Sequence, residues 1–290
     1  MAKIKGIIIK AISGFYYVES DGEVFTCKAK GNFKNQGIKP LVGDNVIIDS
    51  EDLMVIEVLK RKNFLIRPPV ANIDKLFIIS SYKTPRPNTL NIDRLIAIAE
   101  QQNIEPILIF NKSDLGDMTE FVDIYSKSGF KCVVTSANNE NSCDEILPLL
   151  SGSVSVFTGN SGVGKTSILN KIFKNKTELK TSEVSEKLGR GRHTTRHCEL
   201  FVVNDGYVAD TPGFSAIDME FMLKCEKEDL CELFREFRDL SSNCKFTSCS
   251  HCNDKGCAIA EAVEKGDIEI SRHESYKTIY NELKQVDKWK

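Results

Sequence analysis

The chain has 290 residues, which is enough for two or three domains with cores of ordinary size. Its 39 Lys and Arg are offset by 41 Asp and Glu, which gives a formal charge of −2. This charge excludes the class of strongly basic nucleic-acid-binding proteins. No apolar run approaches the ~20 residues of a membrane span. Lys3, Lys5 and Lys10 leave no long apolar run at the start of the chain, so no signal peptide is apparent. We therefore expect a cytoplasmic monomer without a membrane partner.

The N-terminal region is a series of short strands. Five such segments within about 60 residues, separated by turn-forming residues, are typical of a small OB-type barrel. This region carries eleven basic and eight acidic residues before position 68. Its aromatic residues either stack on bases or fill the core, and Arg67-Pro68-Pro69 predicts a linker after the barrel. The predicted strands are 4–12, 15–19, 23–29, 45–49 and 54–59, and the aromatic residues are Tyr16, Tyr17, Phe25 and Phe33.

A signature for reading guanine follows the linker. The apolar run 107–110 predicts a buried parallel strand that ends at Asn111-Lys112-Ser113-Asp114. The Asp114 carboxylate can accept hydrogen bonds from both N1 and N2 of guanine. Adenine has no such donor pair, so this aspartate favours GTP over ATP. Ser136-Ala137, which follows the apolar segment 133–135, is a plausible second base contact.

A phosphate-binding loop lies farther along the chain. Residues 159–166 match the pattern G-x-x-x-x-G-K-[ST] between an apolar strand, 154–157, and an amphipathic helix. Lys165 would reach the β- and γ-phosphates, and the Thr166 hydroxyl would bind Mg²⁺. The predicted phosphate contacts are Gly159, Asn160, Ser161, Gly162, Val163, Gly164, Lys165, Thr166 and Ser167.

A hairpin of strands 201–203 and 207–209 leads to Asp210-Thr211-Pro212-Gly213. Asp210 would hold Mg²⁺, and the Gly213 amide would contact the γ-phosphate. A hydroxyl from Thr194 or Thr195, in the glycine- and arginine-rich loop before the hairpin, would complete the magnesium shell. Between 171 and 196 the chain has eight Lys or Arg against three Glu, a local basic patch.

Two histidines bear on hydrolysis. Ras-like enzymes place a water-orienting Gln where this chain has Phe214, so unstimulated hydrolysis should be slow. His193 is the candidate that orients or deprotonates the water, and His197 is a weaker one. The alternative for His193 is contact with RNA or a surface position. His273 is expected on the surface of a helix.

The C-terminal part is helical in pattern and rich in cysteine. Two apolar stripes predict helices that pack together: Leu230, Leu233, Phe234 and Phe237, and Tyr276, Ile279, Tyr280 and Leu283. Between 244 and 257 lie four cysteines and one histidine, enough for a closed tetrahedral Zn²⁺ site of the structural type. A disulfide is the alternative, which a cytosolic protein disfavours.

The order of these motifs is unusual, because the guanine reader precedes the phosphate loop. Together with Gly191-Arg192-His193-Thr194-Thr195, Asp210 through Phe214 and the cysteine cluster, it resembles the bacterial ribosome-small-subunit-dependent GTPase A family over essentially the whole chain. The resemblance implies late maturation of the small (30S) ribosomal subunit, with its 16S rRNA, as the process served. At the family's spacing the zinc ligands are Cys244, Cys249, His251 and Cys257. Cys252 is surplus and could replace His251.

We therefore expect a multidomain protein. An all-β OB barrel would occupy residues 1–67, a circularly permuted α/β P-loop GTPase 68–224, and a mainly α-helical zinc-binding domain 225–290. The expected activity is hydrolysis of GTP to GDP on the small subunit, with release after hydrolysis. One alternative is a GTP-dependent switch acting on a protein partner. Another is a nucleic-acid-binding module whose nucleotide site only controls the binding of nucleic acid.

Overall fold

The structure is a computed structural model that describes residues 3–31, 33, 37–174, 198–210 and 223–286. Within it the chain divides into two compact units, and both are discontinuous in sequence. The first unit comprises Met1–Phe77, Asn139–Gly159 and Lys165–Phe214, and the second comprises Ile78–Asn138, Asn160–Gly164 and Ser215–Lys290.

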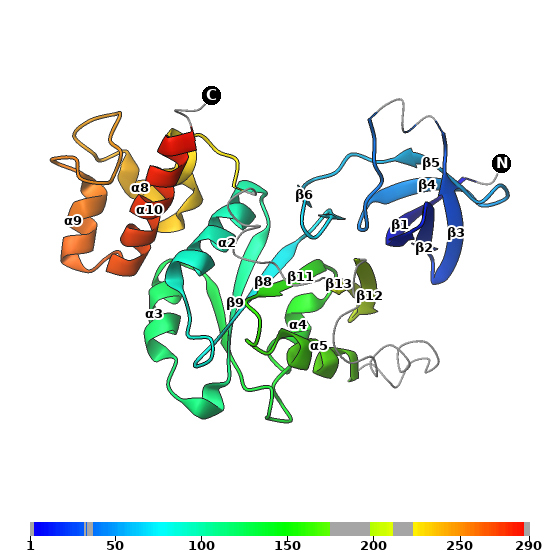
Figure 1. Ribbon diagram of the computed structural model, residues 1–290, viewed down its shortest axis with the longest axis horizontal. Coiled ribbons are helices and arrows are strands. Elements are labelled where there is room, and N and C mark those ends of the chain that lie inside the picture. The colour runs from blue at the N-terminus through cyan, green and yellow to red at the C-terminus, as the bar shows by residue number, and fades with distance from the viewer. Residues whose placement is uncertain (1–2, 32, 34–36, 175–197, 211–222, 287–290) are drawn as a thin grey trace. The chain divides into compact units, whose positions relative to one another are not determined.

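A closed five-stranded barrel begins the first unit (Figure 1). The first strand pairs antiparallel with both the second and the fourth, and the third runs parallel to the fifth, which closes the barrel. Ile8, Val18, Val46 and Val55 fill it and are fully buried. The predicted OB-type barrel is therefore confirmed. Its strands are β1 (Lys3–Ile12), β2 (Phe15–Ser20), β3 (Glu23–Ala29), β4 (Asn45–Asp49) and β5 (Met54–Val58).

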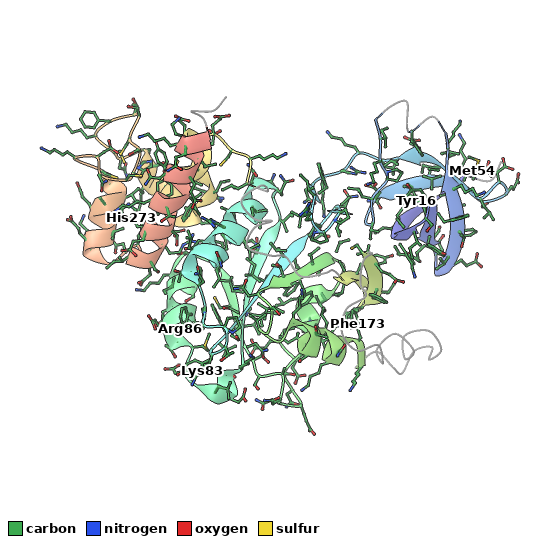
Figure 2. The ribbon with its side chains drawn as sticks, in the orientation of Figure 1. Tyr16, Met54, Lys83, Arg86, Phe173 and His273 are labelled. Atoms are coloured by element: carbon green, nitrogen blue, oxygen red, sulfur yellow. The ribbon has the colours of Figure 1, made fainter. Side chains whose placement is uncertain are left out.

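One expectation about this region was wrong, and one open alternative is decided. The segment predicted as a linker is a small hairpin, because β6 (Phe64–Leu65) and β7 (Val70–Ala71) pair antiparallel and Val70 is buried. Phe33 is only 6 % exposed, so it belongs to the core and is not available to stack on a base. Tyr16, labelled in Figure 2, is half-buried, as are Tyr17 and Phe25.

The rest of the first unit contains the strand and helix on either side of the phosphate loop. β11 (Val154–Gly159) runs parallel to β13 (Gly206–Asp210), which forms the predicted hairpin with β12 (Glu199–Val203). The helix α5 (Lys165–Lys174) buries Ile168, Leu169, Ile172 and Phe173, as its apolar spacing predicted. Phe173 packs on Phe201 of β12 with ring centroids 5.1 Å apart (Figure 2). A short helix, α4 (Leu147–Leu150), precedes β11.

In the second unit, strands and helices position the guanine-reading motif. The strand order is β10-β9-β8, and every residue of β9 except the first is buried, as expected for an internal parallel strand. The side chain of Asn88 caps the first of the helices, α2, by accepting from Asn91 N at 3.0 Å. The elements are β8 (Lys75–Ser81, from Ile78 in this unit), α2 (Thr89–Gln101), β9 (Glu105–Asn111), η1 (Ser113–Leu115), α3 (Thr119–Lys127) and β10 (Lys131–Val134).

The C-terminal helices of this unit share one core, which both predicted apolar stripes enter. Leu230, Phe234, Phe237, Tyr276 and Ile279 are each at most 2 % exposed, and Leu233, Tyr280 and Leu283 pack against them. The first stripe starts in a 3₁₀ helix instead of an α-helix. The elements, coloured yellow to red in Figure 1, are η2 (Lys227–Leu233), α8 (Arg235–Ser241), α9 (Ala258–Lys265) and α10 (Ile270–Val286).

A fully buried arginine attaches these helices to α2. The Arg272 guanidinium of α10 donates to Asp93 of α2 at 2.6 Å and to Glu236 of α8 at 2.7 Å. It also lies 4.6 Å from the ring centroid of Phe234. Because a buried cation needs paired carboxylates, this contact fixes how α10 and α8 pack on α2.

Candidate nucleotide site and metal centre

Asn111 connects three segments that are far apart in the sequence. It ends β9 and is 1 % exposed. Its Nδ2 donates to the Val163 carbonyl of the phosphate loop at 2.8 Å, and its Oδ1 accepts from the Ala137 amide at 3.0 Å. One side-chain amide therefore holds the guanine-reading segment, the Ser-Ala segment and part of the phosphate loop together without any ligand.

The phosphate loop needs glycine at position 164. Gly164 has φ +96°, and a Cβ there would lie 2.1 Å from Asn111 Nδ2. Gly162 also has a positive φ, +84°. A side chain at position 164 would both strain the backbone and push Asn111 away. The close approach of loop and strand is what the glycine pattern of a phosphate cradle provides.

Lys112 is turned toward the phosphate loop. Its backbone is left-handed, with φ 63°, and its Nζ donates to the Gly162 carbonyl at 2.7 Å and to the Thr84 carbonyl at 3.0 Å. The ammonium group thus spans the phosphate loop and the loop that follows β8.

Asp114 is exposed and already oriented. One carboxylate oxygen accepts from the Ser136 hydroxyl, and the other accepts from Asn138 Nδ2 at 3.0 Å. The hydrogen bond from Ser136, assisted by the one from Asn138, holds the pKa of the Asp114 carboxyl below its usual range. The carboxylate is therefore ionised and presented to solvent. Sequence reasoning missed Asn138, because an asparagine after Ser136-Ala137 has no distinguishing pattern.

The phosphate side of the predicted site is described in part. Gly159 ends β11, both it and the following Asn160 are half-buried, Ser161 is exposed and Val163 is buried. Lys165 begins α5, and Thr166 and Ser167 in its first turn are exposed. Asp210 is the last residue of β13, paired in register with Glu199. His193, Thr194, Thr195, His197, Gly213 and Phe214 lie outside the described residues.

The predicted zinc ligands come together in space. One ligand atom from each of Cys244, Cys249, His251 and Cys257 lies within 4.8 Å of all the others. His251 Nδ1 is 3.5 Å from Cys244 Sγ and 3.7 Å from Cys257 Sγ. A tetrahedral Zn²⁺ with bonds of about 2.3 Å to sulfur and about 2.0 Å to nitrogen needs ligand atoms about this close. Cys252 is not part of the group.

The chemistry of this cluster suits a cation. Burial lowers the pKa of His251, so its imidazole is neutral and has a lone pair to give. Burial raises the pKa of the Cys249 and Cys257 thiols, and the neighbouring thiols raise that of Cys249 further. A cation bound between them would favour the thiolate form. The donor set of three sulfurs and one nitrogen fits a structural zinc ion.

His273 supports the cluster, which corrects its expected surface position. It is 5 % exposed, and its Nε2 donates to the His251 carbonyl at 2.7 Å. Tyr276, one turn further along α10, donates its hydroxyl to the Ser250 carbonyl at 3.2 Å. His251 itself has φ 57°, so these two contacts hold the backbone on both sides of a strained residue. His273 Nε2 and the Tyr276 hydroxyl are thus both bonded to backbone carbonyls of the cysteine loop.

All ten cysteines are free thiols, so no disulfide competes with the cluster.

Among the described residues, no helix combines the length and the apolar character needed to cross a membrane.

Comparison with known proteins extends these observations over the chain. The family model for the RsgA GTPase matches residues 58–220, and that for the RsgA N-terminal domain matches residues 5–54. A protein of Caldanaerobacter subterraneus subsp. tengcongensis named "Small ribosomal subunit biogenesis GTPase RsgA" is 42 % identical over 99 % of this chain and 98 % of the relative. A Listeria monocytogenes protein, "Small ribosomal subunit biogenesis GTPase RsgA 1", is 43 % identical over 97 % of this chain and 98 % of the relative.

Two solved structures are also similar. YloQ, described as a circularly permuted GTPase, gives a TM-score of 0.82 at 32 % identity and covers 98 % of this chain and 96 % of its own. YjeQ from Thermotoga maritima gives a TM-score of 0.80 at 33 % identity and covers 97 % of this chain and 99 % of its own. The permuted order of the motifs is therefore a property of the fold.

Proposed function

The chain belongs to the RsgA GTPase family, whose members hydrolyse GTP, and from this premise we propose that it acts in biogenesis of the small ribosomal subunit. In this proposal it binds the 30S subunit and its 16S rRNA with GTP, in the cytoplasm, as a monomer, and leaves after hydrolysis. The observation that carries the GTPase part is the ionised Asp114 carboxylate, fixed beside Lys112 and Asn111. The names of the relatives support the ribosomal part.

We assign the base to one group of residues and the phosphates to another. Asp114 accepts from guanine N1 and N2, Lys112 covers the ring, and Asn111, Ser136 and Ala137 hold these contacts in place. The loop and first helical turn from Gly159 to Ser167 enclose the phosphates with backbone amides. Lys165 contacts the β- and γ-phosphates, and the Gly213 amide contacts the γ-phosphate.

Magnesium, when bound, neutralises charge that develops on the phosphates. Thr166 and Asp210 are the residues that would hold it, with Thr195 completing the shell. Cys244, Cys249, His251 and Cys257 would hold zinc and keep the loop between α8 and α9 folded. We also propose three domains, with boundaries near residues 67 and 224.

The runner-up is a GTP-dependent switch that acts on a protein partner. It is less well supported, because the names of the relatives specify a ribosomal subunit and an OB-type barrel is a common nucleic-acid fold. Turnover of GTP with and without purified small subunits separates the two. We expect subunits to stimulate turnover, with Asp114→Asn at a GTP concentration below its weakened affinity as the control. Stimulation by a soluble protein fraction but not by subunits would favour the switch.

His193 is proposed as the residue that positions the attacking water. Phe214 offers no polar group at the usual place, so another side chain must supply it. His193→Ala should keep GTP affinity and GTP-dependent attachment to subunits, but lose stimulated turnover by roughly 10²–10⁴-fold. The variant should accumulate on immature subunits, which sedimentation would detect. Full stimulated turnover would transfer the role to the subunit or to His197.

A further inference from the structure

The loop that joins β8 to α2 lies against the phosphate loop. Lys112 Nζ donates to the carbonyls of both Thr84 and Gly162, at 3.0 and 2.7 Å. A Cβ at Gly162 would lie 3.7 Å from Pro85 Cδ and 3.8 Å from the Thr84 carbonyl oxygen, which is van der Waals contact. Residues 82–88, which we call the β8–α2 loop, therefore border the segment proposed to hold the phosphates of GTP.

The β8–α2 loop is fixed in this position by contacts other than Lys112. The Tyr82 amide donates to the Asn111 carbonyl at 3.2 Å, and the Ser81 hydroxyl donates to the Pro85 carbonyl at 3.1 Å. The ring of Tyr82 covers Gly116, where a Cβ would lie 2.1 Å from Tyr82 Cζ. The start of the loop is thus tied to the guanine-reading segment, so a partner that docks on the loop lies beside that segment.

Two cations of this loop have no acidic partner within the described part of the chain. Lys83 and Arg86 are exposed and extend from the loop (Figure 2). The first turn of α2 holds no acidic residue. Asp117, which follows Gly116 in the sequence, accepts hydrogen bonds from the amide and hydroxyl of Thr119 at 2.9 and 2.6 Å.

Six other Lys or Arg side chains of the same unit pair with a carboxylate inside it, whereas Lys131 among the described residues has no such pair. Lys83 and Arg86 are therefore distinguished by their position beside the phosphate loop. The paired cations are Arg94, Lys127, Lys227, Arg235, Arg238 and Arg272.

We propose that Lys83 and Arg86 bind the phosphate backbone of RNA in the small ribosomal subunit; this inference rests on the proposed function. RNA suits the surface better than a protein does, because the exposed side chains of the loop, at 83, 84, 86 and 88, are all polar. Protein interfaces usually bury an apolar or aromatic centre. A guanidinium forms two parallel hydrogen bonds with a phosphate, and a lysine adds a point charge.

The position of the contact determines what it does. Lys112 links the β8–α2 loop to the carbonyl of Gly162, so RNA bound at Lys83 and Arg86 would lie beside the nucleotide. The contact should lower the concentration of subunits needed for stimulation. It should leave GTP affinity and unstimulated turnover unchanged, because neither side chain is part of the nucleotide-binding residues.

The test uses Lys83→Gln, Arg86→Gln and the double variant of the full-length protein. Binding to purified small subunits is measured with a non-hydrolysable GTP analogue over a range of salt concentrations. The double variant should bind roughly tenfold more weakly and lose about one to two from the slope of log affinity against log salt. The matched control is Lys131→Gln, which removes an exposed charge at the amino end of β10, the end opposite the nucleotide residues.

Four results would overturn the inference. The first is an unchanged salt slope and affinity in the double variant. The second is an equal effect of Lys131→Gln. The third is weakened GTP binding without subunits, which would assign the cations to the nucleotide. The fourth comes from protein-free 16S rRNA as the probe: if only intact subunits sense the two charges, they bind a ribosomal protein. Failure of the wild-type protein to bind subunits would instead contradict the proposed function itself.

Discussion

The guanine-reading loops and the cysteine cluster lie in the same compact unit but are organised in different ways. In the loops, the chain itself satisfies the functional side chains: Asn111 bonds to Val163 and Ala137, and Asp114 bonds to Ser136 and Asn138. In the cluster, four ligand atoms face one another, and burial raises the pKa of the Cys249 and Cys257 thiols. The first region is preorganised without a ligand, whereas the second has a donor set that suits a cation.

The two regions also differ in the sequence separation between the residues that form them. The loops draw on positions from 84 to 164, which only the tertiary fold brings together. The cluster draws on positions from 244 to 257, within one loop and the start of one helix. Loss of the ligand should therefore disturb the cluster far more than the loops.

The largest effect is expected for Cys249→Ser. Structural zinc contributes about 10–16 kcal/mol of apparent binding free energy in small domains, and this energy is coupled to folding. Replacing one thiolate with a hydroxyl should release the metal and loosen the segment between α8 and α9. Zinc content by atomic absorption and the thermal unfolding curve give the measurement.

Cys252→Ser is the matched control for this prediction. Cys252 is adjacent in sequence but outside the group of ligand atoms. The Cys252→Ser variant should retain its zinc and its thermal stability. Loss of zinc from Cys252→Ser with retention in His251→Ala would show that Cys252 takes the place of His251.

The second effect separates metal binding from attachment to α2. Arg272→Met leaves Asp93 buried without its cation, which should cost about 3–5 kcal/mol of unfolding free energy in urea titrations. Zinc should stay bound at saturating metal, because Arg272 does not contact the cluster. Adding Asp93→Leu should recover part of the loss. A loss below about 1 kcal/mol in Arg272→Met would show that the ion pair is dispensable.

The sequence predicted local features better than those made by distant contacts. The barrel strands, the hairpin before Asp210 and the apolar face of α5 follow from alternation, turn residues and helical spacing, which are properties of short segments. Arg272 gives no such signal, because its burial depends on Asp93, far away in the sequence, and His273 was misassigned for the same reason.

The third effect concerns Asp114. Asp114→Asn leaves the guanine donors poorly paired and should weaken GTP binding by roughly 1–3 kcal/mol. Xanthine carries a carbonyl where guanine has its amino group, so the variant should gain affinity for XTP. Titration calorimetry with both nucleotides measures the two changes. A folded variant with unaltered GTP affinity would remove Asp114 from the base site.

The smallest effect is in the pH dependence of base recognition. The hydrogen bond from Ser136 keeps the pKa of Asp114 below the usual value of about 4. The binding free energy that depends on the carboxylate is therefore fully present above that value and lost only as pH falls through the lowered pKa. The ratio of GTP affinities between wild type and Asp114→Asn should stay constant from about pH 7.5 to about pH 5. A ratio that falls over this range would mean that the pKa is raised.

The most direct test of the difference between the two regions is the GTP affinity of zinc-depleted protein. The contacts with α2 come from η2, α8 and α10, and the cysteine loop makes none of those described above. Protein stripped with a chelator, with its zinc loss confirmed by metal analysis, should bind GTP within about twofold of the loaded protein, a difference of less than about 0.5 kcal/mol. A loss of GTP affinity in step with zinc would contradict the account, because the guanine-reading loops would then depend on the metal.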